Sequence, residues 1–341
     1  MRVRLMLAVA LAVAGTGATA APVAAAAHTT SWRPVMLRLP HGHPDATGTV
    51  AGTDGHGTYA GTLRLGGAMD VVTWRHRKPR VRGVPAGCTD AQVVDMNSVG
   101  VVVGEASGCP SGVQGFVLDG GGFHALQAPD DLPGYVIVKA INDRGDVLGL
   151  VDDDDDFNTT GVLWPGGGGP ATVFPPSGQG EIVQDLDDDG TILFGTTAAI
   201  GSYVWRDGVK TPLANPPDYA FGDAVYPQAI SNGRVVGLLA TGNGNTGVLW
   251  RRPDDPVMVP GSTVAADVNA TGLVLGQLPR PLTSLGPPAL WQETTPLGTL
   301  PTPPGYTDVG ASAVSDGGEV LGHAYNGDTF SEGAPVVWRR H

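Results

Sequence analysis

The sequence lacks the short motifs that mark common enzyme classes. It has no G-x-S-x-G nucleophile elbow, no H-E-x-x-H helix and no phosphate-binding loop. The S-x-D-x-G-x-T-W boxes of sialidases are absent as well. Carboxylates are plentiful, but a pair that acts as acid and base is defined by a distance that a sequence does not contain. No catalytic residue can be assigned, and the sequence favours a non-enzymatic protein without deciding the question.

Basic residues are also scarce. The chain has 20 Lys and Arg against 33 Asp and Glu, and its formal net charge is −13. A protein this acidic repels the phosphate backbone of DNA or RNA, because like charges repel at the encounter. We therefore expect no nucleic-acid partner.

Long hydrophobic runs are missing except near the first residue. After Arg2 and Arg4 comes an apolar stretch of about eleven residues, which is shorter than the roughly 20 that span a bilayer. Small residues ending in A-x-A follow, the layout of a cleaved secretory signal peptide, with a retained anchor as the alternative. We expect residues 1–27 to be removed, by a cut after Ala20 or as late as Ala27. Residues 28–341 would then form a secreted, extracellular monomer that does not contact the membrane.

Glycine, in contrast, is abundant and periodic. The chain has 52 glycines and 29 prolines. A pattern of Asn, Asp or Ser, then Gly, then a second Gly after two or three apolar or small residues recurs along it, as in "NDRGDVLG" and "NATGLVLG". The first glycines of the seven copies are Gly57, Gly100, Gly145, Gly190, Gly233, Gly272 and Gly318. Spacings of about 40–45 residues indicate a repeat architecture.

Each copy predicts a tight turn between two antiparallel strands. In the third copy Asn142 begins the turn, where its side chain can bond the backbone two residues on, and Gly145 takes the left-handed conformation. That chemistry is typical of a type I turn followed by a glycine bulge. The flanking "VIVKAI" and "DVLGLV" are rich in β-branched residues, which favour strands. The second glycine, Gly149, predicts the close approach of a neighbouring strand.

A third strand ends at an aromatic signal. Six copies have a tryptophan there, and the second copy has Leu118; the tryptophans are Trp74, Trp164, Trp205, Trp250, Trp291 and Trp338. Their fixed place in the repeat favours packing between repeats over a sugar-binding platform, because a large apolar body with one N–H donor suits a half-buried site. A fourth strand then runs to a proline, as in "PVMVP".

Four short strands per repeat are typical of a propeller blade. The last copy ends just past its third strand, whereas Trp32 precedes an apolar run that leads to Pro40. An N-terminal strand can therefore complete the last blade and leave no long edge exposed. The sequence predicts one all-β domain over residues 28–341, a seven-bladed β-propeller of four-stranded antiparallel blades closed by the N-terminal strand. Six or eight blades are the alternatives.

The core "AINDRGDVLG", followed by "GVLW", resembles the HAF-repeat family of extracellular bacterial proteins. The resemblance covers essentially all of residues 32–341, and "AISNGRVVG" and the first copy depart most from it. It implies a secreted repeat domain. The family is defined by its repeats and implies no catalytic residues.

Cysteine occurs only twice, at Cys88 and Cys109. An exported protein permits a disulfide, and the two lie at equal sequence distances on either side of the turn predicted at residues 97–100. In a hairpin of simple register they face each other near its open end. We predict a bridge that contributes about 3 kcal/mol by closing its loop. Two free thiols are the alternative, and a metal site is disfavoured because no histidine is nearby.

One acidic segment has two interpretations. "DLDDDG", from Asp185 to Gly190, matches the opening of a calcium loop, but Thr196 stands where an EF-hand requires Glu. The same residues occupy the turn position of the repeat, where Asp and Gly are expected in any case. The structural turn is favoured, and calcium is the only cofactor left open.

Two further segments could hold cations. The aspartates at 152–156 are either a solvated loop between the second and third strands of their blade or a cation site. His41, His43 and Asp45, with His56 further on, are either a loop or metal ligands, since alternate residues of an extended chain point the same way. We favour the loop in both cases.

The longer connections of the repeat carry aromatic residues. The first-to-second and third-to-fourth turns are mostly short, so longer loops such as "NPPDYAFGDAVYP" gather on the other face. Rigid scaffolds commonly present function on such loops. The candidate ligand face consists of Tyr135, Tyr219, Phe221 and Tyr306, with Tyr226, Tyr325 and Phe330 nearby. The alternative is that these aromatics seal the blade ends.

Two functions of different classes follow. The first is a binding or interaction module for a glycan or a protein, outside the cell or at the cell envelope. The second is an extracellular polysaccharide hydrolase or lyase with its site at the channel mouth. A cluster of His, Tyr, Arg and two carboxylates in one pocket would favour the enzyme.

Overall fold

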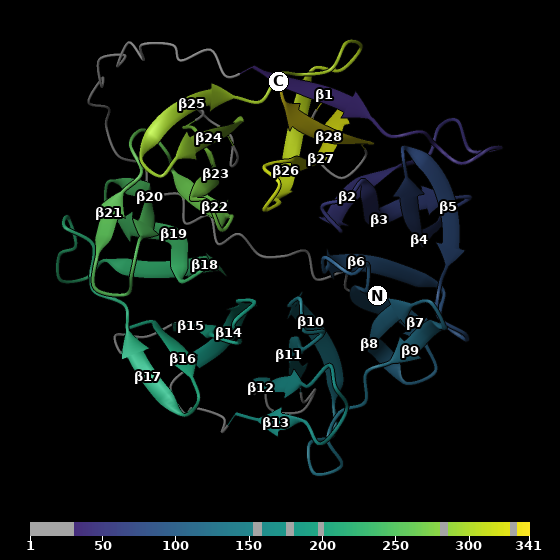
Figure 1. Ribbon diagram of the computed structural model, residues 1–341, viewed down its shortest axis with the longest axis horizontal. Coiled ribbons are helices and arrows are strands. Elements are labelled where there is room, and N and C mark those ends of the chain that lie inside the picture. Colours follow the sequence, from purple (N-terminus) through teal and green to yellow (C-terminus); the bar gives the residue numbers. More distant parts are fainter. Residues whose placement is uncertain (1–30, 153–158, 175–180, 197–200, 280–285, 328–332) are drawn as a thin grey trace.

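The computed structural model describes residues 31–152, 159–174, 181–196, 201–279, 286–327 and 333–341. Its strands form seven four-stranded antiparallel sheets, arranged as blades around a central channel (Figure 1). The fold class predicted from the repeat is confirmed. No helix in the described part of the chain is long and apolar enough to cross a membrane.

The blades follow one another along the chain, and each begins with its innermost strand (Figure 1). The first four are blade 1, β2 (Thr47–Thr53), β3 (Thr58–Leu65), β4 (Ala68–Arg75) and β5 (Lys78–Gly83); blade 2, β6 (Asp90–Met96), β7 (Val102–Cys109), β8 (Gly112–Asp119) and β9 (Gly122–Ala125); blade 3, β10 (Tyr135–Ile141), β11 (Val147–Asp152), β12 (Thr159–Trp164) and β13 (Thr172–Val173); and blade 4, β14 (Glu181–Leu186), β15 (Ile192–Thr196), β16 (Tyr203–Arg206) and β17 (Val209–Pro212). The last three are blade 5, β18 (Ala224–Ser231), β19 (Arg234–Thr241), β20 (Gly244–Trp250) and β21 (Pro256–Met258); blade 6, β22 (Val264–Val268), β23 (Leu273–Gln277), β24 (Pro288–Gln292) and β25 (Thr295–Thr299); and blade 7, β26 (Asp308–Val314), β27 (Val320–Tyr325), β28 (Ala334–Arg340) and β1 (Trp32–Met36).

The N-terminal strand closes the ring as predicted. Strand β1 pairs with β28 in antiparallel register, with Trp32 opposite Arg340 and Val35 opposite Val337. Blade 7 therefore joins the two ends of the described chain in one sheet, in the order β1-β28-β27-β26. Closing the ring in this way ties the first and last repeats together and leaves only short outer edges.

The hairpin turns have the predicted chemistry. The first glycine of every repeat lies at positive φ, between 73° and 95°. In the third repeat the amide of Gly145 donates to the carbonyl of Asn142 at 2.9 Å, and the Asn142 amide donates to Asp146 at 3.1 Å. This is the turn with a glycine bulge that an N-x-x-G signal predicts.

The second glycine of each repeat lies where two strands approach closely. A methyl group added at Gly322 would sit 2.0 Å from the carbonyl oxygen of Gly310 on β26, a backbone atom that has no freedom to move aside. The same conflict with an inner-strand carbonyl occurs at Gly61, Gly104, Gly149, Gly237 and Gly276. In blade 4 the equivalent Gly195 differs, because its nearest neighbour is the amide end of the flexible Gln184 side chain at 2.8 Å.

This difference gives a matched pair of substitutions. We expect Gly322→Ala to lower the free energy of unfolding by about 1–3 kcal/mol, the usual cost of overpacking. Gly195→Ala should be neutral or slightly stabilising, because the Gln184 side chain can rotate and alanine restricts the unfolded chain. Urea denaturation followed by far-UV circular dichroism measures both. Equal losses in the two variants would contradict the close-approach explanation.

The tryptophans pack between blades, as expected from their place in the repeat. Four of them are at most 1% exposed, namely Trp74, Trp250, Trp291 and Trp338, while Trp164 and Trp205 are half-buried. The indole N–H of Trp250 donates to the carbonyl of Ala214, in the connection from blade 4, at 2.8 Å. Trp74, Trp164, Trp291 and Trp338 make equivalent bonds. Each such tryptophan therefore ties its blade to the connection that enters it.

The predicted disulfide is present. Cys88 and Cys109 are bonded, with their Cα atoms 4.0 Å apart. They lie at the open end of the β6–β7 hairpin, where Cys88 stands two residues before the first residue of β6 and Cys109 ends β7. The bridge therefore closes the innermost hairpin of blade 2.

Candidate functional site

The central channel is lined by the first strand of every blade, and each of these strands carries a bulge at the same place (Figure 1). From blade 1 to blade 7 along the chain, the residue after the bulge alternates between a small residue and aspartate, so the neighbouring blades 7 and 1 both have a small residue. Blades 2, 4 and 6 have the channel aspartates, Asp95, Asp185 and Asp267. Blades 1, 3, 5 and 7 have Gly52, Ala140, Ala229 and Ala313.

Each channel aspartate bridges two blades. One oxygen of Asp267 accepts from the amide of Val268 at 2.8 Å, and the other accepts from the amide of Val314 in blade 7 at 2.7 Å. The same arrangement is repeated by Asp95 with Met96 and Ile141, and by Asp185 with Leu186 and Ile230. A bulge frees backbone N–H groups from the ladder, and the carboxylates satisfy them across the blade boundary.

Burial governs the charge state of these three groups. It raises the pKa of Asp95 to about 6 and the pKa of Asp267 to about 7, and it raises the pKa of Asp185 well above its ordinary value. The two N–H donors on each carboxylate oppose the rise, whereas neighbouring channel carboxylates add to it. When these three carboxyls ionise, they place negative charge in the buried channel, and the backbone N–H donors offset only part of the cost of burying it.

This arrangement predicts a pH-dependent stability. The folded protein holds these protons more tightly than the unfolded chain does, so their stabilising effect is complete at about pH 4 and is lost as the pH rises through about 6–7. Replacing Asp267 by Asn removes one titrating group. We expect the stability of Asp267→Asn relative to the wild type to rise by a few kcal/mol as the pH increases from about 4 to 8, at about 1.4 kcal/mol per pK unit. The Asn NH2 group faces one of the two backbone N–H donors, and this adds a cost that is the same at every pH.

Urea unfolding at a series of pH values measures this gain. Asp207→Asn is the control, because the Asp207 side chain is 93% exposed at a blade edge. A difference between Asp267→Asn and the wild type that stays constant with pH would contradict the prediction.

A second tier of polar residues lies at the hairpin turns above the channel aspartates. Asp143 accepts from the amide of Ser98 in blade 2 at 2.9 Å, and Asp188 accepts from the amide of Asp143 at 2.9 Å. Asp316 accepts from Ala270 at 2.8 Å in the same manner. At the boundaries between blades 2 and 3, 3 and 4, and 6 and 7, neighbouring turns are thus linked through one carboxylate.

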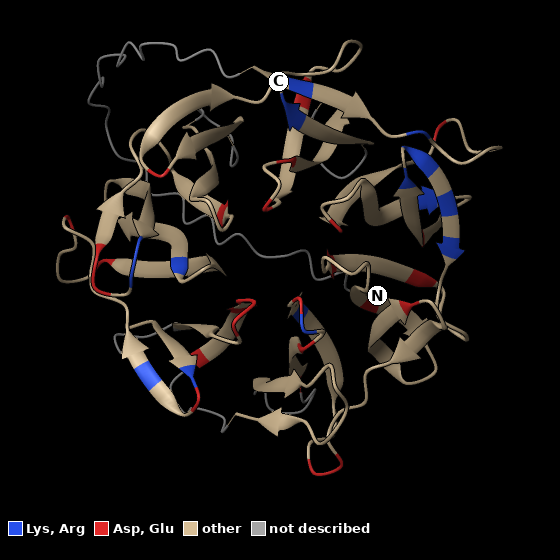
Figure 2. Ribbon diagram, in the orientation of Figure 1, with Lys and Arg blue, Asp and Glu red and all other residues tan. Residues whose placement is uncertain are grey.

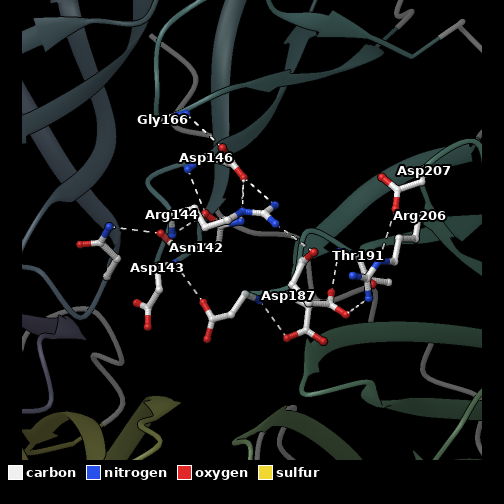
Figure 3. A network of polar contacts seen from close by, with 12 residues as sticks. Asn142, Asp143, Arg144, Asp146, Gly166, Asp187, Thr191, Arg206 and Asp207 are labelled. Atoms are coloured by element: carbon white, nitrogen blue, oxygen red, sulfur yellow. Dashed lines mark hydrogen bonds and ion pairs between the residues drawn. The ribbon is translucent and has the colours of Figure 1, made fainter.

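The turns of blades 3 and 4 form the most extensive part of this network (Figure 3). Arg144 donates to Asp146 of its own turn at 2.7 Å and reaches the carbonyl of Asp189 in blade 4 at 3.0 Å. Asp146 also accepts from the amide of Gly166 at 3.0 Å, which ties the third-to-fourth turn to the first-to-second turn. Asp189 pairs in turn with Arg206. The network joins neighbouring blades on this face.

These turns surround a cavity of about 200 Å³ at the channel mouth. Five carboxylates line it, from Asp54, Asp95, Asp143, Asp188 and Asp316. The lining residues in the described part of the chain include no His, Lys, Arg or Tyr. Carboxylates alone can attract a cationic group. The His, Tyr and Arg that would complete the cluster expected of the enzyme are not among the described lining residues.

The calcium-like segment serves as a turn in this structure. Its three alternate aspartates face different partners: Asp185 faces the channel, Asp187 accepts from Asn232 and Gly233 in blade 5, and Asp189 pairs with Arg206. Within the described residues, no three His, Cys, Asp or Glu side chains lie close enough to hold a metal ion. The side chain of Thr196 is outside the described part.

The other two cation candidates are placed as follows. His43 lies in a tight turn, its amide donating to Pro40 and its carbonyl accepting from Ala46, and Arg64 shares the small hollow beside it. The positive charge of Arg64 would repel a metal ion, which weakens the case for a metal site there. In the aspartate run, Asp152 ends β11 and the other four aspartates lie outside the described residues.

The four residues of the candidate ligand face fall into two groups. Tyr135 begins β10, where its ring lies against Gly112 of blade 2, and Tyr306 packs on the core cluster that contains Trp338. Both are half-buried. Tyr219 is 36% exposed and Phe221 is fully exposed. Packing thus accounts for the first two, whereas the last two are presented to solvent. Phe330 is outside the described residues.

Tyr219 and Phe221 belong to the aromatic loop, residues 213–223, between β17 and β18. The loop is held at its base, where the Ala214 amide donates to Pro253 at 2.7 Å and the Ala214 carbonyl accepts from Trp250. Its tip is a turn in which Asp223 accepts from the Ala220 amide at 2.8 Å. Tyr226, which is 37% exposed on the following strand, adds a third aromatic side chain. A loop that is fastened at its base and folded into a turn at its tip therefore presents Phe221 to solvent.

Asp95 and Asp267 are functional candidates that the sequence reasoning did not single out, and it named Asp185 only as the start of the calcium-like segment. A signal for them exists: Asp95, Asp185 and Asp267 each stand two residues before the first residue of their turn. The bulge that turns this position toward the next blade is a feature of strand pairing, which a motif search does not reveal.

Comparisons with known proteins support the architecture. No family model matches the sequence, and neither does any curated protein. Solved structures do match: an oligogalacturonate lyase in complex with manganese has TM-score 0.61 and 10% identity, and covers 92% of this chain and 95% of its own. YCF48 from Cyanidioschyzon merolae has TM-score 0.54 and 10% identity, and the match covers 90% of this chain and 98% of YCF48. A virginiamycin B lyase from Staphylococcus aureus has TM-score 0.52 and 12% identity, and the match covers 90% of this chain and 98% of the lyase. At these identities the likeness shows the propeller fold alone.

Proposed function

We propose that this protein is an exported binding module that holds a glycan or protein ligand on its aromatic loop. The observation that carries the proposal is Phe221, a large apolar side chain that is fully exposed in a loop fastened at its base and folded into a turn at its tip. Exposing such a ring to water costs free energy, which contact with a ligand recovers. Tyr219 and Tyr226 are further exposed aromatic side chains within five residues of Phe221, and the acidic Asp218 and Asp223 lie in the same stretch of chain.

Export is part of the proposal. The N-terminal segment has the layout of a signal peptide, and the Cys88–Cys109 disulfide fits an oxidising compartment. The HAF-repeat resemblance points the same way. Intact-mass measurement of the protein recovered from the culture medium tests this, with a cut expected between Ala20 and Ala27. Recovery of the uncleaved chain from the membrane fraction would contradict it.

The alternative, a polysaccharide hydrolase or lyase, has one supporting observation. Carboxyls with raised pKa at the channel mouth are suited to act as general acids. Against it, both oxygens of Asp95 already accept backbone N–H bonds. Release of new chain ends from a polysaccharide, abolished by Asp95→Asn, would establish the enzyme.

Binding is tested with Phe221→Ala. We expect the mature protein to retain ligands from a glycan array or from an extract of cell-surface proteins, and Phe221→Ala to lower affinity at least tenfold, because a fully buried aromatic ring contributes about 1.5–3 kcal/mol. Val209→Ala is the control, because Val209 is 64% exposed on the neighbouring strand β17 and outside the loop. Equal binding by Phe221→Ala and the wild type would refute the assignment to this loop.

A further inference from the structure

Blade 1 carries a concentration of positive charge on an otherwise acidic protein. Its outer hairpin, β4 to β5, contains the segment "RHRKPRVR" at residues 75–82. The basic edge consists of Arg75, Arg77, Lys78, Arg80 and Arg82, together with Arg38, whose amide donates to the Arg77 carbonyl at 3.3 Å. Figure 2 shows this charge as a blue band along β5, on the outer rim of the ring. The chain as a whole has net charge −13.

Among the described residues these charges have no acidic partner. In the described part of the chain, no ion pair involves any residue of the basic edge. Arg77 and Arg82 donate to backbone carbonyls, of Met36 at 3.1 Å and of Asp119 at 3.4 Å. Burial lowers the pKa of Arg82, and the neighbouring charge of Arg80 lowers it further. The edge is thus a set of cations that repel one another.

The outer hairpins of blades 4 and 5 neutralise their basic residues. In blade 4 Arg206 pairs with Asp189, and Lys210 pairs with Glu181 at 3.2 Å. In blade 5 Arg251 pairs with Glu293 and Arg252 with Asp254, each at 3.2 Å. Charged residues on an edge strand often serve only to prevent edge-to-edge pairing. That purpose does not explain blade 1, because strands β9, β13, β21 and β25 occupy the same outer position without any Lys or Arg.

The turn of this hairpin has two non-glycine residues at positive φ. His76 and Arg77 have φ values of 50° and 68°, which a two-residue hairpin turn normally assigns to Asn and Gly. The equivalent turn in blade 4 has Asp207 and Gly208. Non-glycine residues in this region cost about 1 kcal/mol or more each, and such strain gathers at functional sites. In blade 1 this conformational cost accompanies the placement of Arg77, which is exposed, at the tip of the hairpin.

The geometry is that of a line of charges. Lys78 and Arg80 alternate with Pro79 and are both exposed, so their positions along the strand are about 6.6 Å apart, at roughly 3.3 Å per residue. The six residues of β5 extend about 20 Å by the same rise. Arginine is suited to paired hydrogen bonds with carboxylate or sulfate groups. A line of this kind matches a linear polymer better than the plane of a membrane, and the surrounding negative charge opposes the long, dense charge of DNA.

We propose that the basic edge of blade 1 binds a linear anionic polysaccharide. Several negative groups of one chain contact the arginines and Lys78 in succession along β5, which relieves the repulsion among them. The surface lies across the ring from the aromatic loop (Figure 1), and its function does not depend on a ligand there.

The test uses the mature protein with four basic residues changed to Gln, R75Q/R77Q/K78Q/R80Q. The control, R206Q/K210Q/R251Q/R252Q, removes the same number of charges from the outer hairpins of blades 4 and 5. The probes are polygalacturonate, dextran sulfate and neutral dextran, measured by affinity electrophoresis at rising NaCl, and circular dichroism verifies that both variants are folded.

We expect the wild type and the control variant to bind one or both anionic polymers and not neutral dextran, with affinity that falls as salt rises. The blade 1 variant should bind at least tenfold more weakly. Equal loss in both variants, retention by the blade 1 variant, or no binding of the wild type to either polymer would overturn the proposal. Tighter binding to phosphatidylserine vesicles or duplex DNA, or self-association through this edge seen by sedimentation, would overturn it as well.

Discussion

Trp250→Ala should lower the free energy of unfolding by about 3–5 kcal/mol, the usual cost of truncating a buried tryptophan. Trp250 is completely buried in a cluster that joins blade 4, through Leu193 and Val204, to blade 5. Truncation leaves a cavity at this boundary and removes the N–H donor of the Ala214 carbonyl. Because the cavity cannot collapse without moving a blade, most of the cost should remain.

Two further variants separate the contributions to this loss. Trp250→Phe keeps most of the apolar contact and loses the bond to Ala214, so it should cost about 1–2 kcal/mol. Trp205→Ala, at the equivalent position of blade 4, should cost less than Trp250→Ala because Trp205 is only half-buried. Urea denaturation followed by far-UV circular dichroism compares them. Similar losses for Trp205→Ala and Trp250→Ala would contradict the importance of burial between blades.

The same substitution bears on ligand binding. Ala214 is the base of the aromatic loop, and Trp250 fastens its carbonyl. A loop released at one end gains conformational freedom that ligand binding must then remove. Trp250→Phe is therefore also expected to weaken ligand binding while the aromatic side chains of the loop itself are unchanged.

Removal of the disulfide should have the second large effect. Cys88→Ser/Cys109→Ser is expected to lower the free energy of unfolding by about 3 kcal/mol, because the bridge restricts the unfolded chain over a separation of 21 residues. The bridge closes the first hairpin of blade 2, which contains the channel aspartate Asp95. The wild type treated with reductant should lose about the same stability as the double variant.

Reductant provides the control for this prediction. The double variant has no disulfide, so its unfolding curve should not change when reductant is added. An unfolding curve of the double variant that matches the oxidised wild type would contradict the prediction. Thiol titration of the unfolded wild type confirms which form was measured.

The repeat and its chemistry could be predicted because they depend on residues close together in the chain. Asn142 and Gly145 specify a turn through contacts within four residues, and the structure has that turn. Gly322 marks a close strand approach because a side chain there meets the backbone of its hairpin partner. The closing strand followed from counting strands against tryptophans.

The candidate site could be predicted only in part, because exposure is decided by distant contacts. Tyr306 and Phe221 stand in similar loops of the repeat, yet Tyr306 packs on the core and Phe221 is fully exposed. Asp95 and Asp188 come from different blades, and the ring brings both to one cavity. The charges of Arg75 and Arg80 are visible in the sequence. Only the structure shows that these two side chains have no acidic partner among the described residues.

The sequence by itself determined the all-β class, the seven repeats, the turn glycines, the closing strand and the disulfide pair. Each depends on local sterics or on a regular spacing along the chain. The tertiary structure alone decided which aromatics stay exposed, that three aspartates bridge blades in the channel, and that the cations of one blade edge have no acidic partner among the described residues. These features depend on the closing of the ring, which brings side chains from different repeats within hydrogen-bond distance and leaves others in solvent.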